Sequence, residues 1–125
     1  MASSLGTDAP NESASYTRRA DRYQALLDTM RDRAETIRAG GGPKRVERQH
    51  KRGKWTARER IAYLLDDPDD FLELGLFAGY AMYEDEGGCP AGGTVMGLGH
   101  VSGRLCIVVA NDATVKAGAW FPITA

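Results

Sequence analysis

The stretch of sequence that decides the fold is GGTVMGLGHVSGRLCIVVANDATVKAGAW, residues 92–120. Its middle, residues 105–110 (LCIVVA), is the most apolar run of the chain and includes several β-branched residues. A continuous run of this kind is typical of a strand that is buried on both faces. Ser102-Gly103 precedes the run as a two-residue turn, and residues 94–101 lead into that turn. The sequence therefore predicts a β-hairpin over residues 94–110.

Polar and small residues follow the apolar run directly. Residues 111–114 (NDAT) have the composition of a turn, and residues 115–120 (VKAGAW) are small and include a glycine. In open α/β sheets, ligands bind beyond the carboxyl ends of the strands. If the chain has a working loop, we therefore expect it at residues 111–120.

Composition limits the classes of protein to which the chain can belong. Its 125 residues suit one domain, and 42% hydrophobic with 26% charged residues is ordinary for a globular protein. The net charge of −1 does not favour nucleic acid or a membrane as partner, and no apolar run approaches the ~20 residues of a membrane span. Two cysteines, Cys89 and Cys106, lack metal-ligand spacing. We expect a cytoplasmic protein without a metal, a secretory signal or a membrane anchor.

The amino-terminal third of the chain is expected to be helical. Residues 1–15, rich in Ser and Ala, are predicted to be a disordered tail. Residues 16–39 are predicted to form a helix, because apolar residues recur at alternating spacings of three and four: Ala20, Tyr23, Leu27, Met30, Ala34 and Ile37. A stripe this narrow packs either on another helix or subunit or on its own domain, and the sequence leaves both open.

A basic segment follows the glycine-rich end of that helix. Residues 40–42 (GGG) end the helix, and Pro43 suits the first position of the next one. Residues 44–60 carry eight Lys or Arg and two Glu, with a capping box from Thr56 to Glu59 that opens a further helix. That helix places Ile61, Leu64 and Leu65 on one face.

The basic segment has two interpretations. It either binds a polyanion, meaning nucleic acid or the phosphates of a nucleotide-bearing cofactor, or it is a solvated surface paired with the five carboxylates of residues 66–73. Nucleic acid is the least favoured, because Trp55 is the single aromatic residue among the cations.

The rest of the chain carries few signs of chemistry. Residues 71–74 are predicted to be a short strand, residues 76–82 to lie over the sheet, and residues 83–93 to be a loop. His50 and His100 have no catalytic partner at a useful spacing, so we expect structural roles for both. No nucleophile elbow, P-loop or zinc cluster occurs in the sequence.

The apolar strand also suggests that more chain belongs to this fold. A strand buried on both faces needs neighbours, and the crossover helix and parallel strand that would supply them are expected after Ala125. We expect the amino-terminal piece of a longer protein. The alternative is a small, complete α+β domain.

Three stretches carry a family resemblance. They are residues 40–80 (GGGPKRVERQHKRGKWTARERIAYLLDDPDDFLELGLFAGY), residues 90–120 (PAGGTVMGLGHVSGRLCIVVANDATVKAGAW) and the closing FPIT. Together they resemble the carboxyltransferase (β) subunit of biotin-dependent acyl-CoA carboxylases. Within that family, NDATVKAGAWFPIT is more similar to the methylcrotonoyl-CoA than to the propionyl-CoA carboxylases.

The resemblance implies a fold, a reaction and partners. The fold is α/β, the amino-terminal part of a crotonase-like (ClpP/crotonase) fold preceded by helices, with a helical segment at 16–70 and the acyl-CoA domain beginning at 71. The reaction moves a carboxyl group from carboxybiotin, carried by a partner (α) subunit, to an acyl-CoA. Methylcrotonoyl-CoA is favoured, with propionyl-CoA or acetyl-CoA possible. β subunits of the family also assemble as homo-oligomers.

The resemblance also implies a site within the loop. Backbone N–H groups hold the developing enolate oxygen in this family, which requires small residues so that the main chain can come close. We expect these donors at Ala117, Gly118 and Ala119, and we expect Lys116 near the CoA phosphates. The second oxyanion loop and the biotin-facing half are expected beyond residue 125, so the chain alone should be inactive and poorly soluble. The alternative function is a non-enzymatic interaction module that docks a partner through the 16–39 helix and the basic 44–60 segment.

Overall fold

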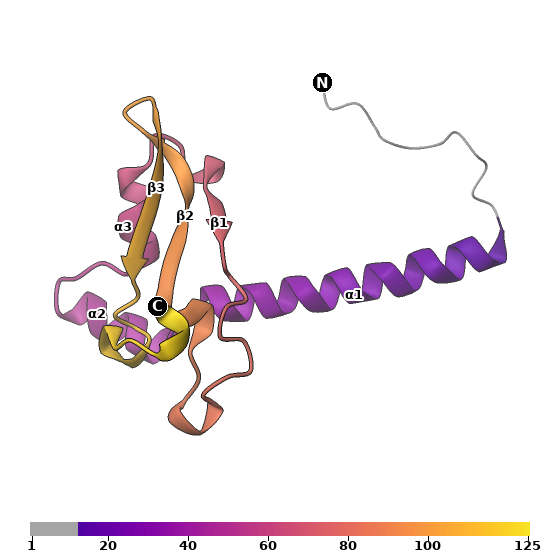
Figure 1. Cartoon of the computed structure of the whole chain (residues 1–125), viewed down its shortest axis with the longest axis horizontal. Coiled ribbons are helices and arrows are strands. Elements are labelled where there is room, and N and C mark those ends of the chain that lie inside the picture. Colours follow the sequence, from indigo (N-terminus) through magenta and orange to yellow (C-terminus); the bar gives the residue numbers. More distant parts are fainter. Residues whose placement is uncertain (1–12) are drawn as a thin grey trace. The chain divides into compact units, whose positions relative to one another are not determined.

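The computed structural model describes residues 13–125, so the tail predicted at residues 1–15 lies outside the described residues except for its last three positions. The elements are α1 (Ala14–Arg38), α2 (Pro43–Lys51), α3 (Ala57–Leu64), β1 (Leu72–Leu74), β2 (Thr94–Val101) and β3 (Arg104–Asn111) (Figure 1). Short 3-10 turns occupy Pro68–Asp70, Glu84–Glu86, Pro90–Gly93, Lys116–Gly118 and Pro122–Thr124. The chain divides between Arg33 and Ala34 into two compact units.

The helix predicted at residues 16–39 is confirmed as α1. In the second unit, Ala34 and Ile37 from its last turns are buried, so this end of the apolar stripe packs on its own domain. In the first unit, Tyr23 and Met30 stay 64% and 47% exposed. A partner for that part of the stripe stays a prediction.

The predicted starts of α2 and α3 are confirmed. Pro43 is the first residue of α2, and Thr56 caps α3 with a complete capping box. The Glu59 N–H donates to Thr56 Oγ1 at 3.3 Å, and the Thr56 N–H donates to Glu59 Oε2 at 2.7 Å. Two hydrogen bonds lower the pKa of the Glu59 carboxyl: the one from the Thr56 N–H has the larger effect, and the one with the His50 side chain has the second largest. The apolar face of α3 is narrower than predicted, because Ile61 and Leu65 are buried while Leu64 is 49% exposed.

The three strands form one antiparallel sheet in the order β1-β2-β3. The predicted hairpin is confirmed: β2 and β3 pair from Thr94–Asn111 to Val101–Arg104. Ser102 and Gly103 at the turn have φ values of 51° and 74°. Two residues with positive φ give the turn a twist that matches the twist of the strands.

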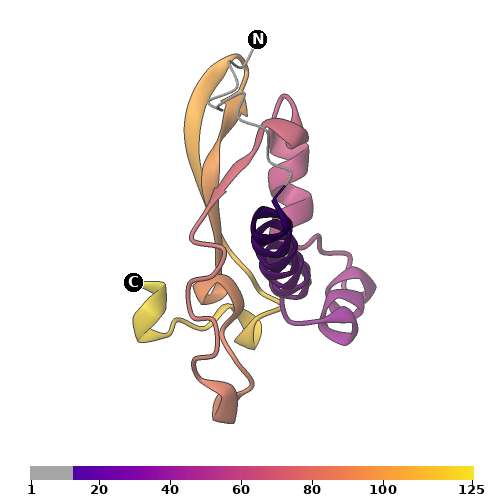
Figure 2. The same cartoon turned by 90° about the vertical axis from the view of Figure 1, so that its right-hand side faces the viewer.

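One face of the sheet packs against α3 (Figure 2). The core consists of Ala57, Ile61, Leu65 and Val95, joined by the partly buried Phe71, Val101, Val108 and Ala110. Glycine in β2 allows this close packing, because a Cβ at Gly99 would lie 2.5 Å from Leu65 Cδ2. Burying a side chain such as Leu or Ile stabilises a fold by about 1.5–3 kcal/mol, so this layer holds the hairpin in place.

The opposite face of the sheet is uncovered. Side chains of β3 alternate along the strand, and Leu105, Ile107 and Val109 are 64%, 71% and 59% exposed. The prediction that residues 105–110 are buried on both faces is therefore wrong for the described chain, because β3 lies at the sheet edge with helical cover on one side only. The segment 76–82 does not supply a second layer, since Phe77, Tyr80 and Met82 are themselves exposed. The same outer face carries Leu72, Leu74 and Met96.

A carboxylate fixes the tip of the hairpin to the end of α3. Asp66 Oδ1 accepts the Ser102 N–H and Asp66 Oδ2 accepts the Gly103 N–H, both at 2.7 Å. The Asp66 N–H in turn donates to the His100 carbonyl at 2.9 Å. These two hydrogen bonds lower the pKa of the Asp66 carboxyl, and the one from the Gly103 N–H has the larger effect.

We predict that Asp66→Asn lowers the stability of the fold at neutral pH, because one carbonyl oxygen cannot replace two carboxylate oxygens. A carboxyl whose folded pKa is depressed stabilises the fold above its unfolded pKa, near 4, and that contribution is lost as the pH falls through the folded pKa. Urea unfolding from pH 7 to pH 2 should show the variant and wild type converging in acid. Asp69→Asn is the control, because the Asp69 carboxylate has no hydrogen-bond or ion-pair partner among residues 13–125. Parallel curves for Asp66→Asn and wild type would contradict the assignment.

Candidate functional site

The loop after β3 is anchored by a buried hydroxyl and a buried carboxylate. Thr114 and Asp112 are 2% and 7% exposed. Asp112 Oδ1 accepts the Thr114 hydroxyl at 2.6 Å and the Thr114 N–H at 2.8 Å. Thr114 Oγ1 accepts the Gly41 N–H at 2.9 Å, which ties the loop to the segment between α1 and α2. Each hydrogen-bond donor of this small network has an acceptor, which offsets the cost of burying it.

The glycines between α1 and α2 allow that contact. A Cβ at Gly41 would overlap the Thr114 carbonyl, and a Cβ at Gly40 would lie 2.6 Å from Asp112 Oδ2. The sequence identified residues 40–42 as the end of a helix, which is correct. Their second role, as the surface against which the loop packs, could not be inferred from helix signals.

The loop then turns through three successive left-handed residues. Lys116, Ala117 and Gly118 have φ values of 47°, 58° and 84°. Left-handed backbone costs a non-glycine residue about 1–2 kcal/mol, so the anchored ends of the loop must hold this shape. The Gly118 N–H donates to the Val115 carbonyl at 2.9 Å, and the Ala119 N–H donates to the Lys116 carbonyl at 3.1 Å. Within residues 13–125, the Ala117 N–H has no acceptor.

A groove of about 650 Å³ lies between this loop and the basic segment. Its volume is in the range of small-molecule sites. The lining residues are Gln49, Arg52, Gly53, Lys54, Trp55, Arg60, Ala113 and Ala117. Three of them are cations and none is an acid, so the groove favours an anion.

The basic segment divides into paired and unpaired cations. Arg58 holds the Glu73 carboxylate through two hydrogen bonds of 3.0 and 2.6 Å, and Lys51 pairs with Glu47. The interpretation that these cations pair with nearby acids is therefore correct for Arg58. The other six have no carboxylate partner among the described residues: Lys44, Arg45, Arg48, Arg52, Lys54 and Arg60.

The structure separates the four residues that the sequence singled out. Ala117 lies in the groove with the unpaired cations. Gly118 and Ala119 close the turn behind it. The Lys116 stem lies beside Gly87, 3.8 Å from where a Cβ on that glycine would be, and so on the side of the acidic turn Glu84–Glu86. Sequence reasoning missed Gln49, whose Nε2 donates to the Ala113 carbonyl at 3.4 Å, because such a contact across the fold leaves no local signal.

Both histidines have carboxylate partners that sequence spacing did not indicate. His50 Nε2 lies 2.9 Å from Glu59 Oε1, and His100 Nδ1 lies 2.7 Å from Asp70 Oδ2. Over residues 13–125, no three His, Cys, Asp or Glu side chains gather as a metal site. No helix in that range has both the length and the apolar character needed to cross a bilayer.

Comparison with known proteins identifies the family. A family model described as the carboxyl transferase domain matches residues 48–125, which include the groove and the loop. The chain belongs to the carboxyltransferase domain family. The resemblance seen in the sequence is thereby confirmed.

Individual carboxyltransferases match most of the chain. A probable mitochondrial methylcrotonoyl-CoA carboxylase beta chain of Drosophila melanogaster is 44% identical over 120 residues, which are 96% of this chain and 21% of that protein. The solved beta subunit of Pseudomonas aeruginosa geranyl-CoA carboxylase superposes with a TM-score of 0.79 at 26% identity, covering 96% of this chain and 22% of that one.

A second solved structure was determined with a CoA ester bound. Transcarboxylase 12S, described as a hexamer with methylmalonyl-CoA bound, has a TM-score of 0.68 at 38% identity over 74% of this chain and 18% of that one. The predicted fold, α/β and crotonase-like with preceding helices, is confirmed by these neighbours. This carboxyltransferase chain spans about a fifth of the length of the curated relatives it matches.

We predict that Thr114→Val destabilises this carboxyltransferase chain by about 1–3 kcal/mol, the cost of leaving buried polar groups unpaired. Valine has a similar shape but offers nothing to the Gly41 N–H or the Asp112 carboxylate. Thr114→Ser is the matched control, because it keeps the hydroxyl and loses only a methyl group. Thermal unfolding should place the serine variant well above the valine variant. Equal losses for the two would mean that packing, and not hydrogen bonding, anchors the loop.

Proposed function

We propose that this chain is the acyl-CoA-binding part of a carboxyltransferase subunit from a biotin-dependent acyl-CoA carboxylase. One observation carries the proposal. The groove places Arg52, Lys54 and Arg60, none with a carboxylate partner among the described residues, beside Ala117, whose N–H has no acceptor there. Acyl-CoA has the matching features, since its phosphates are anionic and its thioester carbonyl accepts a hydrogen bond.

The proposed binding mode assigns a part of CoA to each side of the groove. The phosphates contact the cations of the basic segment through charge-assisted hydrogen bonds. The thioester carbonyl faces the Ala117 amide. Lys116 is proposed as a further phosphate contact, reached from the other side of the loop. Gly118 and Ala119 support the turn that orients the amide.

The chemistry of carboxylation explains why a backbone donor belongs here. A carbon activated by the thioester loses a proton and gains a carboxyl group from carboxybiotin, whose nitrogen–carbon bond breaks and whose nitrogen takes up the proton. Negative charge develops on the thioester oxygen during this exchange. A fixed N–H aimed at that oxygen stabilises the charge more than the uncharged ground state, which is the basis of oxyanion catalysis.

The relatives support the finer assignments. Methylcrotonoyl-CoA is the proposed substrate, with propionyl-CoA or acetyl-CoA as alternatives. A biotin-carrying alpha subunit and further beta subunits are the proposed partners. We expect this 125-residue chain to bind CoA without transferring a carboxyl group, since none of its residues is assigned to biotin. The cytoplasmic setting stays a prediction, because the Drosophila relative is named as mitochondrial.

We predict that the Ala117 amide responds to the thioester. In nitrogen-15 NMR of the labelled chain, its N–H resonance should shift on addition of methylcrotonoyl-CoA and shift much less with free CoA, which lacks the carbonyl. The Gly118 amide is the internal control, because it already donates to the Val115 carbonyl. Equal responses of the Ala117 amide to both ligands would remove it from the proposed oxyanion site.

We predict that Arg52→Ala and Arg60→Ala each weaken CoA binding by about tenfold, since one charge-assisted hydrogen bond is worth about 1.5 kcal/mol or more. Arg48→Ala is the matched control: Arg48 belongs to the same basic segment but does not line the groove. Calorimetry at low and moderate salt should show the two groove variants with a weaker salt dependence. Lys116→Ala, measured alongside, tests the remaining phosphate contact. An Arg48 variant as weak as the groove variants would point to a diffuse charge effect instead of a site.

The alternative function is a docking module without catalysis. It draws support from Tyr23, Leu26 and Met30, which are 64%, 60% and 47% exposed along α1. The same calorimetry separates the two functions. A folded chain that gives no heat with CoA favours docking through this helix and the basic segment.

A further inference from the structure

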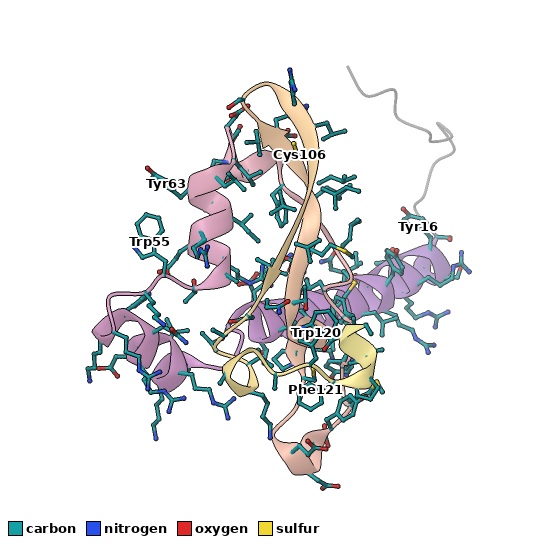
Figure 3. All side chains as sticks on the ribbon, turned by 60° about the vertical axis from the view of Figure 1, so that its left-hand side comes forward. Tyr16, Trp55, Tyr63, Cys106, Trp120 and Phe121 are labelled. Atoms are coloured by element: carbon teal, nitrogen blue, oxygen red, sulfur yellow. The ribbon has the colours of Figure 1, made fainter. Side chains whose placement is uncertain are left out.

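The side chain of Trp55, just before α3, and that of Tyr63, on α3, lie together on the side of α3 that faces away from the sheet (Figure 3). Trp55 and Tyr63 are 54% and 79% exposed. Their ring centroids lie 5.1 Å apart with an interplanar angle of 70°, so the edge of one ring meets the face of the other. Rings this large are costly to leave in water, and an exposed apolar patch beside a groove is typical of a binding site.

Trp55 lines two adjoining recesses. The first is the basic groove that reaches Ala117. The second is a recess of about 660 Å³ lined by His50, Gly53, Lys54, Trp55, Glu59, Ala62 and Tyr63. The two share Gly53, Lys54 and Trp55, so they form one continuous surface that passes over the Trp55 ring. A ligand longer than either recess fits along this path.

The two recesses differ in charge. Arg52, Lys54 and Arg60 line the first, which contains no carboxylate. The second contains the Glu59 carboxylate, which is held by His50 at 2.9 Å. Lys54 lines both recesses, but the first adds Arg52 and Arg60 whereas the second adds the Glu59 carboxylate, so a phosphate is attracted more strongly to the first. A flat, uncharged ring gains contact area in the second.

We infer that the Trp55–Tyr63 recess binds the adenine of CoA, with the ring stacked on the open face of Trp55. This inference rests on the proposed function and extends it. The phosphates lie over Lys54, where the two recesses meet, and over Arg52 in the first recess, and the pantetheine arm runs along the basic groove toward Ala117. Stacking on an aromatic side chain suits any base, because every base has a π-face. The charge difference between the recesses sets the direction in which CoA lies.

The two tryptophans of the chain, Trp55 and Trp120, permit a direct test. In the Trp120→Phe variant, Trp55 is the single indole and its fluorescence reports on the recess. CoA and adenosine 3′,5′-bisphosphate should both quench it. 4′-Phosphopantetheine, which lacks adenine, should bind more weakly and leave the fluorescence nearly unchanged. Quenching by phosphopantetheine equal to that by CoA would overturn the inference.

Calorimetry on Trp55 variants gives an independent readout. Trp55→Ala should weaken CoA binding at least about fivefold, the lower end for loss of one stacked base. Trp55→Phe, which keeps an aromatic ring, should retain most of the affinity. Binding of 4′-phosphopantetheine should be the same in both variants and in the wild type. Because Trp55 is outside the core, circular dichroism should show that the wild type, Trp55→Ala and Trp55→Phe are all folded. If Trp55→Ala does not fold, the fluorescence comparison of CoA with 4′-phosphopantetheine in Trp120→Phe decides the question.

The outcomes separate this inference from the proposed function. If Trp55→Ala binds CoA as the wild type does while Arg52→Ala does not, the adenine assignment is wrong and CoA binding stands. If the bisphosphate quenches Trp55 but acyl-CoA gives no shift of the Ala117 amide, the nucleotide recess stands and the proposed carboxyltransferase site fails. Tighter binding of a single-stranded oligoadenylate than of CoA would overturn both in favour of nucleic acid. Absence of binding by every ligand would also overturn both.

Discussion

The hydrogen bond from the Gly41 N–H to the Thr114 hydroxyl is the contact on which the site depends. It joins two segments 73 residues apart in sequence, and Asp112 completes it from within the loop. A second hydrogen bond, from Gln49 Nε2 to the Ala113 carbonyl, also joins the basic segment to the loop, but at 3.4 Å it is the longer of the two. The Gly41–Thr114 bond and the absence of side chains at Gly40 and Gly41 bring the segment before α2 close to the loop that lines the groove.

The loop conformation follows from that anchor. Two non-glycine residues, Lys116 and Ala117, adopt left-handed backbone angles that are unfavourable for them in isolation. Such strain persists only where the surroundings over-determine the backbone, and here the Asp112–Thr114 pair and the hydrogen bonds of Gly118 and Ala119 supply the restraint. The result is two successive amides, those of Lys116 and Ala117, without an acceptor among residues 13–125, and of the two residues only Ala117 lines the groove.

Much of the fold could be predicted from the sequence because its signals are local. Ser102-Gly103 specified the hairpin, and Thr56 with Glu59 specified the start of α3, through contacts between residues close in sequence. The exposure of β3 could not be predicted, because an apolar run indicates a preference for burial and does not say whether another layer is present.

For the site, the small-residue loop and the basic segment were each visible, but their meeting in one groove was not. Lys116 shows the limit most clearly. Its neighbour Ala117 faces the cations, while its own stem lies beside Gly87, and one step along a turn is enough to send two side chains to opposite sides. The carboxylate partners of His50 and His100 were missed for a similar reason, since each pair is formed only when separate elements come together.

The uncovered face of the sheet has a thermodynamic consequence. Leu105, Ile107 and Val109 remain hydrated in the folded chain much as they are in the unfolded one. The heat-capacity change on unfolding follows newly exposed apolar surface, so it should be small for a chain of this length, and the plot of stability against temperature should be only weakly curved. A second protein layer placed on this face would add the missing apolar burial. Burial of the same side chains would then stabilise both the fold and the association with that layer.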